Sequence, residues 1–157
     1  MNHNDALSQK VMDILENKFG DQIDQYAFPP PVFTEMEAEI VALDMAAGAM
    51  TVQFPVQERY FNPYHAMQGG MVAAAIDNAL GPLSVLVAPP NVTRKLELTY
   101  SRPVTLEMGS IQVHARLIKR DEPRLFFRAE VRSRDGQRVA RAKATHWIIP
   151  APATTPA

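Results

Sequence analysis

Hydrophobic residues near the N-terminus recur at the spacing of one helix face. Leu7, Val11 and Leu15 follow one another at intervals of four residues. This period predicts an amphipathic helix over residues 4–19, ended by Gly20. The stretch "AFPPPVF" comes soon after it. Because proline has a fixed φ and no N–H donor, we expect a rigid extended connector there.

A second helix is predicted over residues 70–87, where the sequence is almost wholly apolar. Its many alanines would let a sheet approach it closely, and "APPN" ends it. Three residues interrupt the apolar run, namely Asp77, Asn78 and Pro82. A membrane-spanning helix needs roughly 18 uninterrupted apolar residues. We therefore expect this segment to be a buried core helix.

Six further segments have the composition and alternation of β-strands. In one of them Ile111, Val113, Ala115 and Leu117 share a face. The dipeptide Asp135-Gly136 is a favourable hairpin turn. The predicted strands cover residues 35–43, 49–56, 93–101, 109–119, 125–134 and 137–149.

The order of these elements predicts an α+β fold. A helix, two strands, one central apolar helix and four strands follow one another, and we expect the last four strands to form a meander. An antiparallel sheet needs its apolar face covered, so we expect a curved sheet wrapped around the central helix. Residues 1–30 would hold the first helix and the connector, 31–149 the main domain, and 150–157 a disordered tail.

Composition limits the possible functions. The 157-residue chain has a net charge of −1, so no basic field attracts nucleic acid or an anionic membrane. It has no cysteine, which excludes disulfides, a thiolate nucleophile and a cysteine-ligated metal. The first twenty residues lack the pattern of a signal peptide. We expect a cytoplasmic protein.

Asp77 is the one acid within the apolar helix. Flanking apolar residues suggest that it is buried, and a buried carboxylate is costly unless it is paired or used. Gly69 and Gly70 precede the helix, where unpaired N–H groups can stabilise an oxyanion. Asp77 lies some 10 Å along the axis from them, so a two-fold dimer would be needed to bring both together. Simpler alternatives are a tight turn at the glycines and a solvated acid.

Three stretches, "QGGMVAAAIDNALG", "LTYSRPV" and "RDGQRVARAKATHWI", support a resemblance to a known family. Together with the element order, they resemble the hotdog-fold acyl-CoA thioesterases of the phenylacetate-pathway (PaaI-like) type. The resemblance covers roughly residues 35–149. It implies a hotdog fold, to which the N-terminal helix is an addition. It also implies sites at the interface of a homodimer, which can pair again into a homotetramer.

The resemblance assigns roles to particular residues. It implies that the N–H of Gly69 forms the oxyanion hole, and that Gln68 and Asn62 orient the thioester carbonyl or support the loop. Asp77 would activate water or attack the carbonyl directly. Thr93, where the family usually has Ser or Thr, would hold the water or the carboxylate. Tyr100 and Pro103 match the end of the family's strand.

One residue departs from the family pattern. Gln68 stands where the family has histidine, and an amide does not titrate. The leading hypothesis is hydrolysis of a medium-chain or aromatic acyl-CoA, without a metal or an organic cofactor. A second hypothesis is an acyl-CoA binding or regulatory protein without turnover. A third, a hydratase or dehydratase, is weaker because the His-plus-acid pair that moves protons is missing.

Further residues are candidates for substrate contact, each with a simpler alternative. Aromatic residues near Asn62 either line an acyl pocket or close the loop onto the core. The run "KRDEPR" either contacts CoA phosphates or forms a solvated hairpin. His114 and His146 show no metal-binding spacing, and we expect structural roles for both. The substrate-binding candidates are Gly70, Tyr64, His65, Arg94, Lys119, Arg120 and Arg124.

Overall fold

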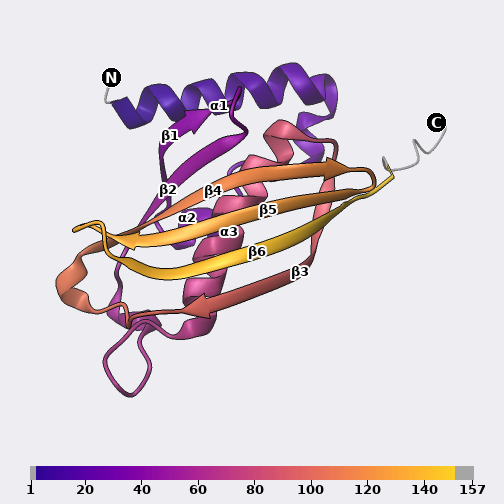
Figure 1. The fold of residues 1–157 in the computed structure, drawn as a ribbon. Helices are drawn as coiled ribbons and strands as arrows, with labels where there is room; N and C mark the ends of the chain where they lie inside the picture. Colours follow the sequence, from indigo (N-terminus) through magenta and orange to yellow (C-terminus); the bar gives the residue numbers. More distant parts are fainter. Residues whose placement is uncertain (1–2, 151–157) are drawn as a thin grey trace.

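A six-stranded antiparallel sheet dominates the structure, a computed structural model that describes the backbone of residues 3–150. Its strand order is β1-β2-β4-β5-β6-β3. The sheet curves around the long helix α3, and the helix α1 lies across one end (Figure 1). The strands are β1 (Glu39–Asp44), β2 (Ala49–Pro55), β3 (Asn91–Tyr100), β4 (Ser110–Asp121), β5 (Arg124–Ser133) and β6 (Arg138–Ile148).

Helix α3 (Gly69–Val87) forms the core together with the inner face of the sheet, as predicted. Its sheet-facing residues follow the 3.6-residue period, and burying each large one stabilises the fold by about 1.5–3 kcal/mol. Among residues 3–150, α3 is the one helix long and apolar enough to cross a membrane, but here it packs inside the sheet. Its buried residues are Val72, Ala75, Ile76, Ala79, Leu80, Leu83, Ser84 and Leu86.

The strands present alternate residues to α3. Ile111, Val113 and Ala115 of β4 are buried, and Leu117 is partly buried against the same core. This confirms the predicted alternation. The predicted hairpin turn is also confirmed, because Gly136 has a φ of +81° between β5 and β6.

The predicted four-strand meander is wrong in one respect. β4, β5 and β6 form a meander, but β3 lies at the far edge, paired with β6. Only the short segment 88–90 joins α3 to β3, so β3 must begin beside the end of the helix. The segment 101–109 then carries the chain across to β4, which pairs with β2. A strand's neighbours are set by such connections, which the alternation pattern does not contain.

The proline-rich segment is partly helical, so the expectation of an extended connector is wrong for its second half. Helix α2 (Pro31–Glu35) begins with proline at its first position, where the missing N–H has no cost. Phe33 of α2 is buried. Because α2 uses residues up to Glu35, β1 begins at Glu39 and not at the predicted residue 35.

The N-terminal helix is confirmed as α1 (His3–Phe19). Val11 and Leu15 of α1 are buried in the same hydrophobic core as α3. A 3₁₀ helix (Gly20–Gln25) follows, which the sequence pattern did not indicate. The predicted tail lies outside the described residues, except for its first residue, Pro150.

Candidate active site

Asp77 and Thr93 meet where α3 passes the start of β3. The hydroxyl of Thr93 donates a hydrogen bond of 2.8 Å to Oδ1 of Asp77. The register of β3 on β6 shifts between Thr93 and Lys95, which makes Arg94 the extra residue of a β-bulge. The structure thus joins two residues that the sequence analysis had proposed for one site.

The expected burial of Asp77 is wrong for the single chain, where its carboxyl is exposed. The helix period explains this, because Ile76 and Leu80 face the sheet and Asp77 points to the side that the sheet does not cover. That side carries small residues, including Ala73 and Ala74. Shelter for the carboxylate would therefore have to come from a second molecule.

His146 lies beside the pair of Asp77 and Thr93, and the sequence analysis did not assign it to the site. It pairs with Thr93 across β6 and β3, and its side chain is 1% exposed. Nε2 lies 3.3 Å from the Thr93 hydroxyl oxygen, and Nδ1 lies 2.9 Å from Oδ1 of Asn91. The signal that would have revealed His146 is the pairing of β6 with β3, which a single sequence does not give.

The hydrogen-bond partners of Asn91 fix the tautomer of His146. The Asn91 amide nitrogen donates to the carbonyls of Pro89 (2.8 Å) and Ser84 (3.3 Å), so its oxygen faces the imidazole. Nδ1 of His146 must then carry the proton and donate to Asn91, which leaves Nε2 unprotonated. Because the single hydroxyl proton of Thr93 is donated to Asp77, the 3.3 Å contact between Nε2 and Thr93 is not a second full hydrogen bond. Burial lowers the pKa of His146, and the Asp77 charge opposes that effect. His146 is therefore neutral at pH 7.

The start of α3 presents free backbone donors. Gln68 is the N-cap residue, and the N–H groups of Gly69 and Gly70 have no acceptor within the part of the chain that the structure describes. The Tyr100 hydroxyl donates to the Gly69 carbonyl at 2.7 Å. A Cβ at Gly69 would lie 3.3 Å from the Tyr100 ring, so the close approach of this ring favours glycine.

Asn62 shapes the loop before α3. Its side-chain oxygen accepts hydrogen bonds from the N–H groups of Tyr64 (2.9 Å) and Ala66 (3.2 Å). This geometry favours the loop-supporting role that was one of the two alternatives for Asn62. Tyr64 is 87% exposed, and His65 has a φ of +60°. Neither lines a pocket with Asp77 in the single chain.

The proposed site residues therefore form two separate groups in one chain. Asn62, Gly69 and Tyr100 line one hollow, while Asp77 and Thr93 line another. Asp77 follows Gly69 by eight positions, which separates the two groups by about 12 Å along the axis of α3. One chain alone does not bring the acid to the free N–H groups.

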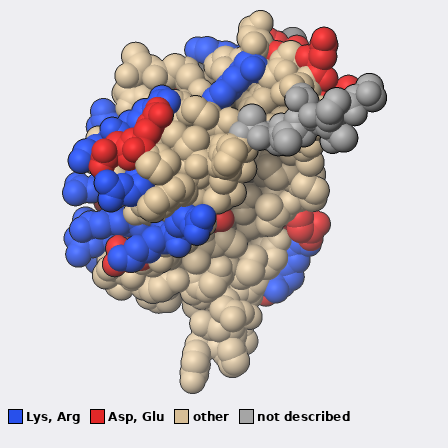
Figure 2. Space-filling view, turned by 90° about the vertical axis from the view of Figure 1, so that its right-hand side faces the viewer, with Lys and Arg blue, Asp and Glu red and all other residues tan. Residues whose placement is uncertain are grey.

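The basic candidates lie at the same end of the sheet as Thr93. One register row joins Thr93, His146, Leu125 and Arg120, so Arg120 lies three strand spacings, about 14 Å, from Thr93. Figure 2 views this end of the molecule and shows Lys and Arg gathered along one side.

The basic side chains also have partners of their own. Arg120 contacts Glu122, and Arg124 contacts Asp121 at 2.7 Å. Lys119 lies 3.9 Å from Asp121, and the Arg94 guanidinium lies 5.8 Å from the centre of the Trp147 ring. Most of these groups are exposed, so the ion pairs are weak and can exchange for a phosphate.

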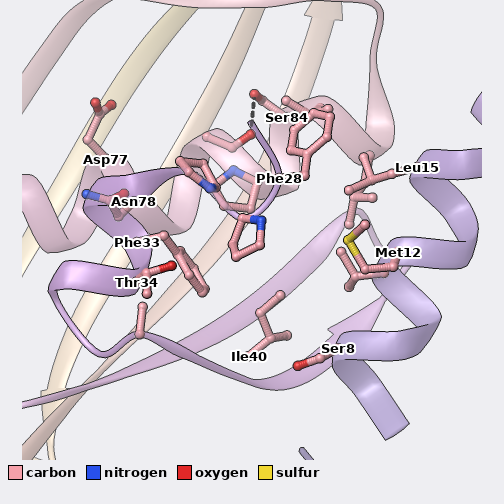
Figure 3. Close-up of a pocket in the computed structure, with 18 of the residues that line it drawn as sticks. Ser8, Met12, Leu15, Phe28, Phe33, Thr34, Ile40, Asp77, Asn78 and Ser84 are labelled. Atoms are coloured by element: carbon pink, nitrogen blue, oxygen red, sulfur yellow. Dashed lines mark hydrogen bonds between the residues drawn. The ribbon is translucent and has the colours of Figure 1, made fainter. Parts of the chain in front are cut away.

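An apolar cavity of about 930 Å³ opens beside Asp77 and extends beneath α1. We call it the α1 cavity. Asp77 and Asn78 lie at one end of it, and Met12 and Leu15 of α1 lie at the other (Figure 3). Its apolar lining includes Val11, Met12, Leu15, Phe28, Phe33, Ile40, Val85 and Leu86. Among the described residues, no group of three His, Asp or Glu side chains is placed to hold a metal ion.

Comparison with known proteins establishes the fold. No protein-family model matches the chain, and no curated protein matches it. The PaaI protein of the Escherichia coli phenylacetic acid degradation operon superimposes with a TM-score of 0.74 at 15% identity, over 92% of this chain and 97% of that chain. This chain has the hotdog fold.

Two further hotdog neighbours extend the comparison. A proposed thioesterase from Ralstonia eutropha JMP134, related to phenylacetic acid degradation, has a TM-score of 0.73 and 26% identity over 86% of this chain and 99% of its own. A hypothetical thioesterase from Streptococcus pneumoniae, solved with coenzyme A, has a TM-score of 0.66 and 17% identity. The match covers 71% of this chain and 85% of that chain. The expected resemblance to PaaI-like hotdog proteins is confirmed.

Proposed function

We propose that this protein is a thioesterase that hydrolyses an acyl-CoA to the free acid and CoA. The observation that supports this best is the Asp77 carboxylate, held by the Thr93 hydroxyl at the mouth of an apolar cavity. The hotdog neighbours add support, since one is a proposed thioesterase and another was solved with coenzyme A.

The proposed site needs two copies of the chain. On α3, Gly70, Ala73 and Ala74 lie beside Asp77 on the side away from the sheet, and such small residues let a second helix approach. A two-fold axis across this face would bring Asp77 of one chain toward the α3 start of the other. We infer a homodimer, or a homotetramer built from two such dimers.

The proposed chemistry uses groups already present in the chain. The thioester carbonyl oxygen would accept hydrogen bonds from the N–H groups of Gly69 and Gly70, and Gln68 would border it. Asp77 would take a proton from water as the water oxygen attacks the carbonyl carbon. The C–S bond then breaks, and the CoA sulfur receives that proton. Direct attack by Asp77, followed by hydrolysis of the anhydride, is the alternative.

The contacts to CoA follow from the same arrangement. Arg94, Lys119, Arg120 and Arg124 would bind its phosphates at the hairpin end of the sheet. Tyr64 and His65 project on their loop beyond the α3 start and would contact the CoA of the neighbouring chain's site.

A second candidate is an acyl-CoA binding protein without turnover. The observation that favours it is Gln68, whose amide does not titrate and makes no capping hydrogen bond to α3. Both candidates use the same two-chain site, so only turnover distinguishes them.

Release of free thiol from a panel of acyl-CoA esters tests the proposed function. We expect wild-type turnover, and a loss of at least 100-fold in kcat for Asp77→Asn with the KM little changed. Glu97→Gln, an exposed carboxylate on the same strand as Thr93, is the matched control and should retain activity. A wild-type protein that binds acyl-CoA without releasing thiol would establish the binding protein instead.

A further inference from the structure

Gly81 and Pro82 lie together within α3 and line the α1 cavity. Glycine and proline are the two residues that disfavour a helix interior most, so helix stability does not explain the pair. A Cβ at Gly81 would meet no heavy atom within 4 Å. The missing side chain leaves open space against the α3 backbone. We infer that this space accommodates a ligand.

Helix α1 forms the far wall of the same cavity. Met12 and Leu15 face it, and the Lys18 ammonium donates to the carbonyls of Val85 and Ala88 at the end of α3. These contacts fasten α1 across the end of α3, and Met12 and Leu15 form the wall of the cavity opposite Asp77 (Figure 3).

The chemistry of the lining favours an uncharged, flexible ligand. Its charged residues are the acids Glu37, Glu39 and Asp77, which would repel a free carboxylate. Its phenyl rings come from Phe28 and Phe33, its other aromatic ring is the His146 imidazole beside Thr93, and most of the remaining surface is aliphatic. A volume of about 930 Å³ is at the upper end of ordinary ligand pockets, which span about 300–1,000 Å³.

The length of the cavity can be worked out from α3. It is lined from Asp77 to Leu86, which corresponds to about 13 Å of helix. An extended chain advances about 1.2 Å per bond, since a three-bond residue spans at most about 3.6 Å. The cavity therefore fits a straight chain of about ten carbons, whereas an aryl group would leave Met12 and Leu15 uncovered.

We propose that the α1 cavity binds a linear aliphatic acyl group of about eight to twelve carbons, and that α1 limits its length. The inference rests on the proposed thioesterase function for the position of the thioester, beside Asp77. The chain would run past Gly81, whose missing side chain leaves room for it, and would end against Met12 and Leu15.

Binding of S-alkyl-CoA thioethers, which have no carbonyl to hydrolyse, tests the cavity without turnover. We expect calorimetry to show affinity rising about fourfold per methylene and levelling off near ten carbons. Gly81→Leu should abolish the rise beyond the first few carbons and leave the shortest thioether unaffected. An affinity that does not depend on chain length, or the same profile in Gly81→Leu, would overturn the proposal.

Substitutions on α1 provide an independent test if Gly81→Leu does not fold. Met12→Trp fills the end of the cavity beside α1, so the levelling-off should move to shorter chains by several carbons. Lys10→Trp adds the same side chain at an exposed position on α1 and should leave the profile as in wild type. An equal shift in both variants would contradict the assignment of α1 as the wall.

Thiol release from acyl-CoA esters of the same chain lengths separates this proposal from the proposed function. If thioethers bind with the expected profile but no ester is hydrolysed, the thioesterase proposal fails and the cavity assignment stands. If esters are hydrolysed at rates independent of chain length, the thioesterase proposal stands and the cavity assignment fails.

Discussion

Proline at position 69 would remove one proposed oxyanion donor and little else. Gly69 is the first residue of α3, where proline is tolerated and its fixed φ of about −65° matches a helix. The preceding Gln68 has a ψ of 137°, in the region that a residue before proline prefers. The N–H of Gly69 has no acceptor within residues 3–150, so no hydrogen bond of the fold is lost.

The expected effect of Gly69→Pro can be separated from the effect of its added carbon atoms. A Cβ at this position lies 3.3 Å from the Tyr100 ring, and Gly69→Ala adds the same Cβ while keeping the N–H. Removing an oxyanion donor raises the activation free energy by about 3–4 kcal/mol. We therefore expect kcat for Gly69→Pro to lie 100-fold to 1,000-fold below that of Gly69→Ala, with a similar KM.

Steady-state thiol release with one acyl-CoA ester measures both variants, and thermal unfolding checks that each is folded. A folded Gly69→Pro protein within about threefold of Gly69→Ala would refute the role of this N–H in catalysis. Equal losses in both variants would assign the effect to the contact with Tyr100.

Three further predictions follow from the same geometry. Mixing Asp77→Asn with Gly69→Pro subunits should recover about one quarter of wild-type activity in a dimer with shared sites; activity no higher than that of each variant alone would argue against shared sites. Because the folded pKa of His146 lies below its unfolded value of about 6.5, the unfolded chain binds the proton more readily. The free energy of unfolding should therefore fall as pH drops below about 6.5, and urea unfolding of His146→Gln should lack that part of the slope. Tyr100→Phe loses the 2.7 Å hydrogen bond to the Gly69 carbonyl. Urea unfolding should show a loss of about 0.5–1.5 kcal/mol, and an unchanged stability would mean that water replaces the bond.

The sequence predicted the positions of the helices and strands better than it predicted which strands pair with one another. Hydrophobic period alone located α1, α3 and the strands to within a few residues, because core packing imposes that period. It did not reveal that β3 pairs with β6, since this depends on how short the segment after α3 is. It also missed α2, because three prolines favour an extended chain until one of them occupies the first position of a helix.

The sequence predicted the part of the candidate site that lies within single helices and strands, but not the contacts between them. Residues within one element, such as Gly69 and Asp77, have a spacing that the sequence fixes. His146 reaches Thr93 only through strand pairing, and the exposure of Asp77 depends on which side of α3 the sheet covers. The pairing of strands and the side of α3 that the sheet covers are features of the tertiary structure. The alternation of residues along one strand does not encode them.

The bulge at Arg94 determines which side chains of β3 lie on each face of the sheet. Before the bulge Thr93 faces inward, and after it Leu96 and Leu98 do, although strict alternation would put Thr93 on the opposite surface from both leucines. If Arg94 were forced into a regular ladder, the strand would have to turn either the Thr93 hydroxyl away from Asp77 or Leu96 and Leu98 out to water. The bulge removes Arg94 from the alternation, so one strand can both pack its leucines in the core and hold Thr93 beside Asp77.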